Sequence, residues 1–194
     1  MKGLTANFSI RKEGVSINTT DRKIKYTALS VAVAIVAVPL YILLHEAGHA
    51  LVSILCGARV TAFSIVGAYT SSVGGNYTVL THSLLHLAGA LLPFMVSICF
   101  LLFYKNDSGR KLYHIVVFYI TIVSAGSLSA WVFVPILYLF GNVPPSDDVS
   151  QFLEVSKIHP LIVSVCAAVV VILYIMWMWK KKVIQNWFKI LQGK

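Results

Sequence analysis

The residues best suited to chemistry lie in the segment YILLHEAGHALVSIL, residues 41–55, where His45, Glu46 and His49 form an HExxH pattern. On a helix, residues i and i+4 lie on the same face, so the two imidazoles can bind one zinc ion. Zinc lowers the pKa of a bound water to about 7, and the intervening carboxylate can accept its proton. The pattern therefore predicts a zinc site in which Glu46 is the general base for attack on an amide carbonyl.

The alternative interpretation of these histidines is structural, as buried side chains that hydrogen-bond to neighbouring helices. The surrounding segment is apolar enough to cross a membrane, and this changes the balance between the two interpretations. An ionisable group at the bilayer centre costs about 2.5–3.5 kcal/mol on insertion scales, and such groups usually mark a functional site. Three of them at ligand spacing favour a metal site.

The composition indicates an integral membrane protein. Of the 194 residues, 58% are hydrophobic and 12% are charged, whereas soluble chains average about 25% charged residues. Four apolar segments, at 27–56, 84–104, 113–140 and 160–179, each approach or exceed the roughly 20 residues that a spanning helix needs. We therefore expect an all-α membrane protein with four transmembrane helices, preceded by a polar basic tail at 1–26. A basic amphipathic tail follows at 180–194.

The positive charge is distributed as expected for a membrane protein with both ends in the cytoplasm. All but two of the 16 lysines and arginines lie in the two tails or in the 105–112 loop, and the exceptions are Arg59 and Lys157. This alternation follows the positive-inside rule. It explains the net charge of +9 by topology and by attraction to anionic lipid, not by binding to nucleic acid. We expect a multi-pass protein in the cell membrane of a prokaryote.

The 57–82 loop is rich in β-branched and aromatic residues, and glycines interrupt it at Gly67, Gly74 and Gly75. This pattern predicts a small β-hairpin or sheet between the first and second spans, at the interface or shielded by protein. One interpretation is a purely structural hairpin. In the other, an unwound substrate segment adds as a strand to its edge, and Gly74 and Gly75 allow close approach.

HEAGHALV, the β-prone segment with Gly74 and Gly75, and then LAGALLPF resemble the site-2-protease family of intramembrane zinc metalloproteases. The resemblance implies a zinc-dependent endopeptidase domain at 27–179 that cuts a membrane protein or peptide in or near a membrane-spanning segment. It also implies that His45, His49 and a distant aspartate bind Zn²⁺, and that Glu46 is the general base. The family's usual Asp-Gly pair in a later span is absent after residue 49. The sequence indicates no oligomeric state.

The third metal ligand is open between several residues. Asp147 and Asp148 begin a predicted short helix that runs to about residue 157. Asp148 shares a helical face with the apolar Phe152 and Val155, which are expected to point inward, whereas Asp147 shares a face with polar residues. Asp148 is therefore the better ligand and Asp147 the better N-cap.

Two further histidines, His82 and His86, are also four residues apart. They could form a second metal pair or replace the aspartate, or they could be interfacial, with His86 near the site.

Two other functions are compatible with the same residues. One is a non-proteolytic membrane binding protein, a pseudoprotease that retains the scaffold. The other is a small transporter that uses the His/Glu cluster. The predicted orientation adds a conflict, because a first span that runs outward puts the histidines at mid-bilayer or beyond it, whereas the resemblance favours a site nearer the cytoplasm. An inverted orientation or an irregular first span would resolve the conflict.

Overall fold

A computed structural model describes the backbone of residues 2–143 and 146–193, and the side chains from residue 19 onward within those ranges. The chain is mostly helical, with four helices long and apolar enough to cross a membrane: Thr19–Leu55, Val79–Leu102, Lys111–Leu139 and Pro160–Lys180. A two-stranded sheet lies between the first and the second. The predicted fold class, an all-α membrane protein with a small hairpin, is therefore confirmed.

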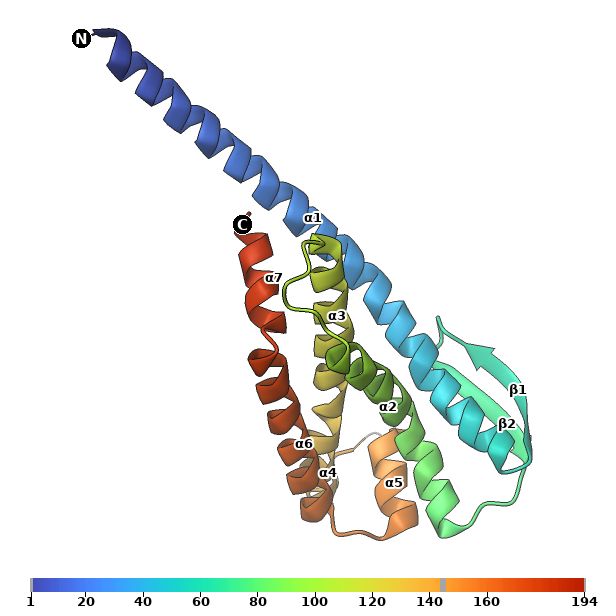
Figure 1. Cartoon of the computed structure of the whole chain (residues 1–194). Helices are drawn as coiled ribbons and strands as arrows, with labels where there is room; N and C mark the ends of the chain where they lie inside the picture. The colour runs from blue at the N-terminus through green and yellow to red at the C-terminus, as the bar shows by residue number, and fades with distance from the viewer. Residues whose placement is uncertain (1, 144–145, 194) are drawn as a thin grey trace.

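The first span belongs to one uninterrupted helix, α1, which runs from Lys2 to Leu55 and contains Pro39 (Figure 1). Residues 19–26, expected to belong to a separate polar tail, continue this helix without a break. The first span is therefore regular, and an irregular backbone does not explain the conflict over orientation.

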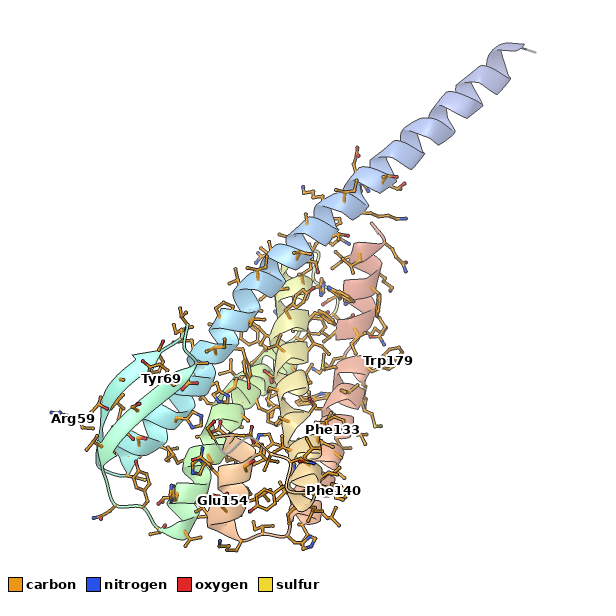
Figure 2. The ribbon with its side chains drawn as sticks, turned by 180° about the vertical axis from the view of Figure 1, so that it is seen from behind. Arg59, Tyr69, Phe133, Phe140, Glu154 and Trp179 are labelled. Atoms are coloured by element: carbon orange, nitrogen blue, oxygen red, sulfur yellow. The ribbon has the colours of Figure 1, made fainter. Side chains whose placement is uncertain are left out.

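The remaining spans pack beside α1. Helix α2 covers Val79–Leu102 and α6 covers Pro160–Lys180, while the third span consists of α3, Lys111–Leu128, and α4, Ala130–Leu139, separated at Ser129. Phe133, Phe140 and Trp179 point outward from the helices and are 62%, 73% and 59% exposed (Figure 2). An apolar outer surface of this kind is suited to lipid.

The hairpin folds back along the last turns of α1 (Figure 1). Gly57 has a φ of +82°, a left-handed conformation that lets the chain reverse directly after α1. Strand β1, Ala58–Ser64, pairs antiparallel with β2, Tyr69–Gly74, with a bulge between Val60 and Ala62. Because the hairpin packs on α1, β2 lies beside the segment that carries the HExxH pattern.

The short helix α5, Asp148–Ser156, packs against α2 and α4. Its buried side chains are Val149, Ser150 and Leu153, and of these Val149 and Leu153 join a core cluster with Trp131 of α4. The sequence-based assignment of Phe152 as an inward residue is only partly right, since Phe152 is half-buried against Trp131. The helix is rotated from the predicted face, so that 149 and 153 are the residues that anchor it.

The C-terminal amphipathic helix, α7, covers Val183–Leu191 and packs on α3. Val183 and Ile190 are buried, and the Trp187 ring stacks on Phe118 with centroids 4.1 Å apart. The 180–194 tail therefore has the expected apolar face, and this face packs against the helical bundle.

Candidate metal centre

Three side chains from two distant segments converge on one point. Nε2 of His45 lies 3.0 Å from Oδ2 of Asp148, and Nε2 of His49 lies 3.2 Å from the same oxygen. The two Nε2 atoms are 3.1 Å apart. Because α1 supplies both histidines and α5 supplies the aspartate 103 residues after His45, the cluster exists only in the folded chain.

The triangle formed by these three atoms suits a metal ion. In a tetrahedral site with bonds of about 2.0 Å, neighbouring ligand atoms are about 3.3 Å apart. The observed separations of 3.0–3.2 Å are close to that value. Two unprotonated imidazole nitrogens repel each other at such a distance unless a cation or a proton lies between them. His45, His49 and Asp148 could therefore hold a metal ion, and three ligands leave a coordination position open for water or substrate.

The Nδ1 atom of each imidazole, on the side of the ring away from the shared centre, also has a hydrogen-bond partner. Nδ1–H of His49 donates a 2.7 Å hydrogen bond to the backbone carbonyl of Leu85. Nδ1 of His45 lies 3.3 Å from the hydroxyl of Tyr41, one helical turn earlier. Metal-binding histidines almost always have such a partner, which fixes the tautomer and leaves Nε2 free for the metal. Both rings are therefore oriented so that Nε2 faces the shared centre.

Two glycines make room for this arrangement. A Cβ atom on Gly89 of α2 would lie 2.4 Å from Nε2 of His49 and 2.6 Å from Nε2 of His45. A Cβ atom on Gly48 of α1 would lie 2.2 Å from the carbonyl oxygen of Ala88. Gly48 therefore lets α1 approach α2 closely, and Gly89 gives the imidazoles their space.

The two neighbouring aspartates have different environments. Asp147 is the N-cap of α5, where its Oδ2 accepts hydrogen bonds from the backbone N–H groups of Val149 and Ser150 at 3.0 and 3.1 Å. Asp148 faces the histidines. Burial raises the pKa of the Asp148 carboxyl, but hydrogen bonds from His45 and His49, when their Nε2 atoms carry protons in place of a metal ion, outweigh burial and hold that pKa below its usual range. The carboxylate form, which binds metals, is thus the favoured one.

Glu46 lies next to the three ligand residues and is 4% exposed. Its Oε2 accepts a 2.9 Å hydrogen bond from the hydroxyl of Thr70 on β2, and the same hydroxyl lies 3.1 Å from the Glu46 carbonyl. The hairpin therefore orients the carboxylate that the sequence predicts to be a general base.

A cavity of about 710 Å³ gives access to the cluster. Its walls include the three ligand residues, Glu46 and five consecutive residues of the hairpin, 68–72. A strand whose successive residues all border a cavity presents its edge to it, because successive side chains point to opposite faces. The free edge of β2 therefore borders the same space as the candidate metal centre.

The second histidine pair belongs to the same cavity. His82 and His86 both line it, and Nδ1 of His86 is 4.0 Å from Oδ1 of Asp148, beyond hydrogen-bond distance. Among the described residues, only His45, His49 and Asp148 form a group with metal-binding spacing. His86 is thus a polar neighbour of Asp148, near the site as the sequence suggested.

Gly74 is the last residue of β2 and Gly75 follows it; both are predicted to contact substrate, and neither is among the described residues that line the cavity. Their φ angles of +82° and +89° are left-handed, which explains glycine at both positions. They allow the turn that leads from the hairpin into α2, and contact with substrate stays a prediction.

Sequence reasoning did not identify Thr70, Gly89, Tyr41 or Leu85 as parts of the site. Of these, Tyr41 was the easiest to predict from the sequence, because it precedes His45 by one helical turn. Gly89 lies within LAGALLPF, one of the segments that carry the family resemblance, but the sequence assigned it no role. Thr70 and Leu85 act from the hairpin and from α2, and no local pattern marks them.

Comparison with known proteins gives no family assignment for this chain: no protein-family model, curated protein or solved structure matches it. The resemblance to the site-2 proteases rests on the residues themselves, and membership of that family stays a prediction.

Proposed function

We propose that this protein is a zinc-dependent intramembrane endopeptidase that hydrolyses a peptide bond in or near a membrane-spanning substrate segment. The observation that carries the proposal is the convergence of His45, His49 and Asp148 beside the buried carboxylate of Glu46, in a chain with four candidate spans. Zinc bound by these three residues would supply Lewis acidity at a substrate carbonyl and would lower the pKa of a bound water.

In this mechanism Glu46 accepts the proton of the attacking water and then transfers it to the leaving amine. Thr70 keeps the Glu46 carboxylate in place through its 2.9 Å hydrogen bond. His86, whose Nδ1 is 4.0 Å from Oδ1 of Asp148, lines the same cavity and would be available as a polar group to a bound substrate.

The hairpin provides a way to present the substrate. A helical segment hides its amides in its own hydrogen bonds, so it must unwind before it can be cut. An unwound segment could pair with the free edge of β2 at residues 69–72, which border the cavity. Backbone hydrogen bonds along that edge would then hold the segment extended beside Glu46.

The test compares the wild-type protein with Glu46→Gln, purified in detergent with bound zinc, on a membrane-spanning reporter. We expect the variant to retain zinc, because Glu46 is not one of the three ligands, and to lose cleavage by at least a hundredfold, the lower range for a general base. Equal cleavage by the two proteins would refute the role of Glu46.

The main rival is a pseudoprotease that binds membrane segments without cutting them. A closed site with four protein ligands would favour that rival, whereas the described residues offer three ligands at an accessible cavity. The comparison of wild type with Glu46→Gln separates the two, since a pseudoprotease binds the reporter equally well with either residue and cuts it with neither.

A further inference from the structure

The candidate metal centre is not placed symmetrically between the two ends of the molecule. Gly89, which lies against both histidines, is about 15 Å along α2 from Val79 and about 20 Å from Leu102, at 1.5 Å per residue. Asp148 begins α5, whose nine residues extend about 13 Å to the loop that precedes α6. The site is therefore closer to the end of the bundle that carries the hairpin, α5 and the start of α2, here called the site end.

The cavity opens toward the site end. It reaches His82 in the first turn of α2, Gln151 on α5 and the exposed Ser146 before α5. None of the described residues that line it belongs to α3, α6, α7 or the 103–110 loop. Water and a peptide would therefore reach the cluster from the site end.

The opposite end of the bundle, here called the basic end, carries the N-terminal part of α1, helix α7 and the start of α3 (Figure 1). Of the 15 lysines and arginines among the residues that the structure describes, 13 belong to it: they precede Tyr26, lie between residues 105 and 111, or follow Trp179. The two exceptions, Arg59 and Lys157, share the site end with Asp147, Asp148 and Glu154. Arg59 and Glu154 both lie in the half of the molecule away from the termini (Figure 2).

The positive-inside rule counts lysines and arginines in short loops and near the ends of spans, and every basic residue here meets that condition. We infer that the basic end is cytoplasmic and that the site end faces the other side of the membrane. If the proposed function holds, its substrate is an extended peptide segment at the non-cytoplasmic interface, reached from outside. This orientation is the reverse of the one that the family resemblance favours.

The orientation in the membrane can be tested independently of any enzymatic activity. Single cysteines are labelled in intact cells with a membrane-impermeant maleimide. Cys56, Cys99 and Cys166 are first replaced by serine, and a cysteine is then introduced by Glu154→Cys or Asp107→Cys, both at exposed positions. We expect the Glu154→Cys protein to react in intact cells and the Asp107→Cys protein to react only after permeabilisation. The reverse pattern, or reaction of both in intact cells, would overturn the inference.

A second experiment addresses the substrate. Two single-span reporters carry the same extended segment, one on the non-cytoplasmic flank of the span and one on the cytoplasmic flank. We expect at least tenfold more cleavage of the first reporter than of the second. The Glu46→Gln protein is the control for both reporters. Cleavage of the cytoplasmic reporter alone, dependent on Glu46, would leave the proposed peptidase intact and refute the orientation. A correct labelling pattern without cleavage of either reporter would instead refute the peptidase and retain the orientation.

Discussion

At the scale of single residues, the candidate metal centre depends on groups that are not ligands. The Nε2 atoms of His45 and His49 can approach each other to 3.1 Å because the facing position of α2 is Gly89. Ligand spacing on α1 therefore provides the metal-binding atoms, and the absence of a side chain on α2 provides the space in which they meet.

Gly89→Ala tests this argument. The new methyl group would lie within 2.6 Å of both Nε2 atoms, so the imidazoles must turn away. Changes beside metal ligands typically reduce metal affinity about 10–100-fold, and we expect a loss in this range, measured by competition with a zinc chelator. The matched control is Gly126→Ala on α3, where an added Cβ meets nothing within 4 Å. Equal zinc affinity of the two variants would show that the histidines do not converge beside Gly89.

At the scale of elements, the hairpin has a specific structural role in the proposed site. It folds back from the end of α1 and brings Thr70 to the carboxylate of Glu46, 24 residues earlier in the chain. A second contact, from the Ser72 hydroxyl to the Ser53 hydroxyl at 3.2 Å, aligns β2 along the same helix. The hairpin is thus one of the elements that position the proposed general base.

Thr70→Val removes the hydrogen bond and keeps the shape of the side chain. Leaving a buried polar group without its partner costs about 1–3 kcal/mol, so we expect cleavage to slow about tenfold while zinc content stays unchanged. Thr70→Ser, which retains the hydroxyl, should restore most of the rate. The control is Thr121→Val on α3, whose hydroxyl donates to the carbonyls of Val117 and Phe118 in its own helix, away from the cavity. A Thr70→Val protein as active as the control would show that the hairpin does not orient Glu46.

Helix packing supplies a second prediction at this scale. Gly48→Ala would bring a methyl group to 2.2 Å from the Ala88 carbonyl oxygen and force α1 and α2 apart. Overpacking of this kind costs about 1–3 kcal/mol, so the melting temperature in detergent should fall measurably relative to Gly126→Ala. An unchanged melting temperature would mean that the two helices can separate at this point without a loss of stability.

The elements also show what the sequence could and could not predict. The four spans, the hairpin and the cap at Asp147 follow from local hydrophobicity, β-propensity and helix-start chemistry, and each is found. The contacts of Thr70 with Glu46 and of Gly89 with the histidines join segments tens of residues apart, and no local pattern encodes such pairs. The rotation of α5, which buries 149 and 153, is set by packing against Trp131.

At the scale of the whole molecule, the candidate metal centre would link parts of the bundle that are otherwise held by side-chain packing. Asp148 stands at the start of α5, which is anchored through Val149 and Leu153 in the cluster around Trp131. The histidines stand on α1, which reaches the basic end of the molecule. A metal ion shared between them would therefore stabilise the folded arrangement as a whole, because the unfolded chain has no such site.

Zinc should accordingly raise the melting temperature of the metal-free protein, and a chelator should reverse the effect. At a free zinc concentration 100 times the dissociation constant, linkage predicts a stabilisation of about 2.7 kcal/mol. The neighbouring aspartates provide the discriminating pair. Asp148→Ala should abolish most of the zinc-dependent shift. Asp147→Ala should lower the melting temperature with or without zinc, since a lost N-cap costs about 0.5–2 kcal/mol, and should keep the shift. Equal zinc-dependent shifts in the two variants would exclude Asp148 as a ligand and leave the two histidines without their acidic partner.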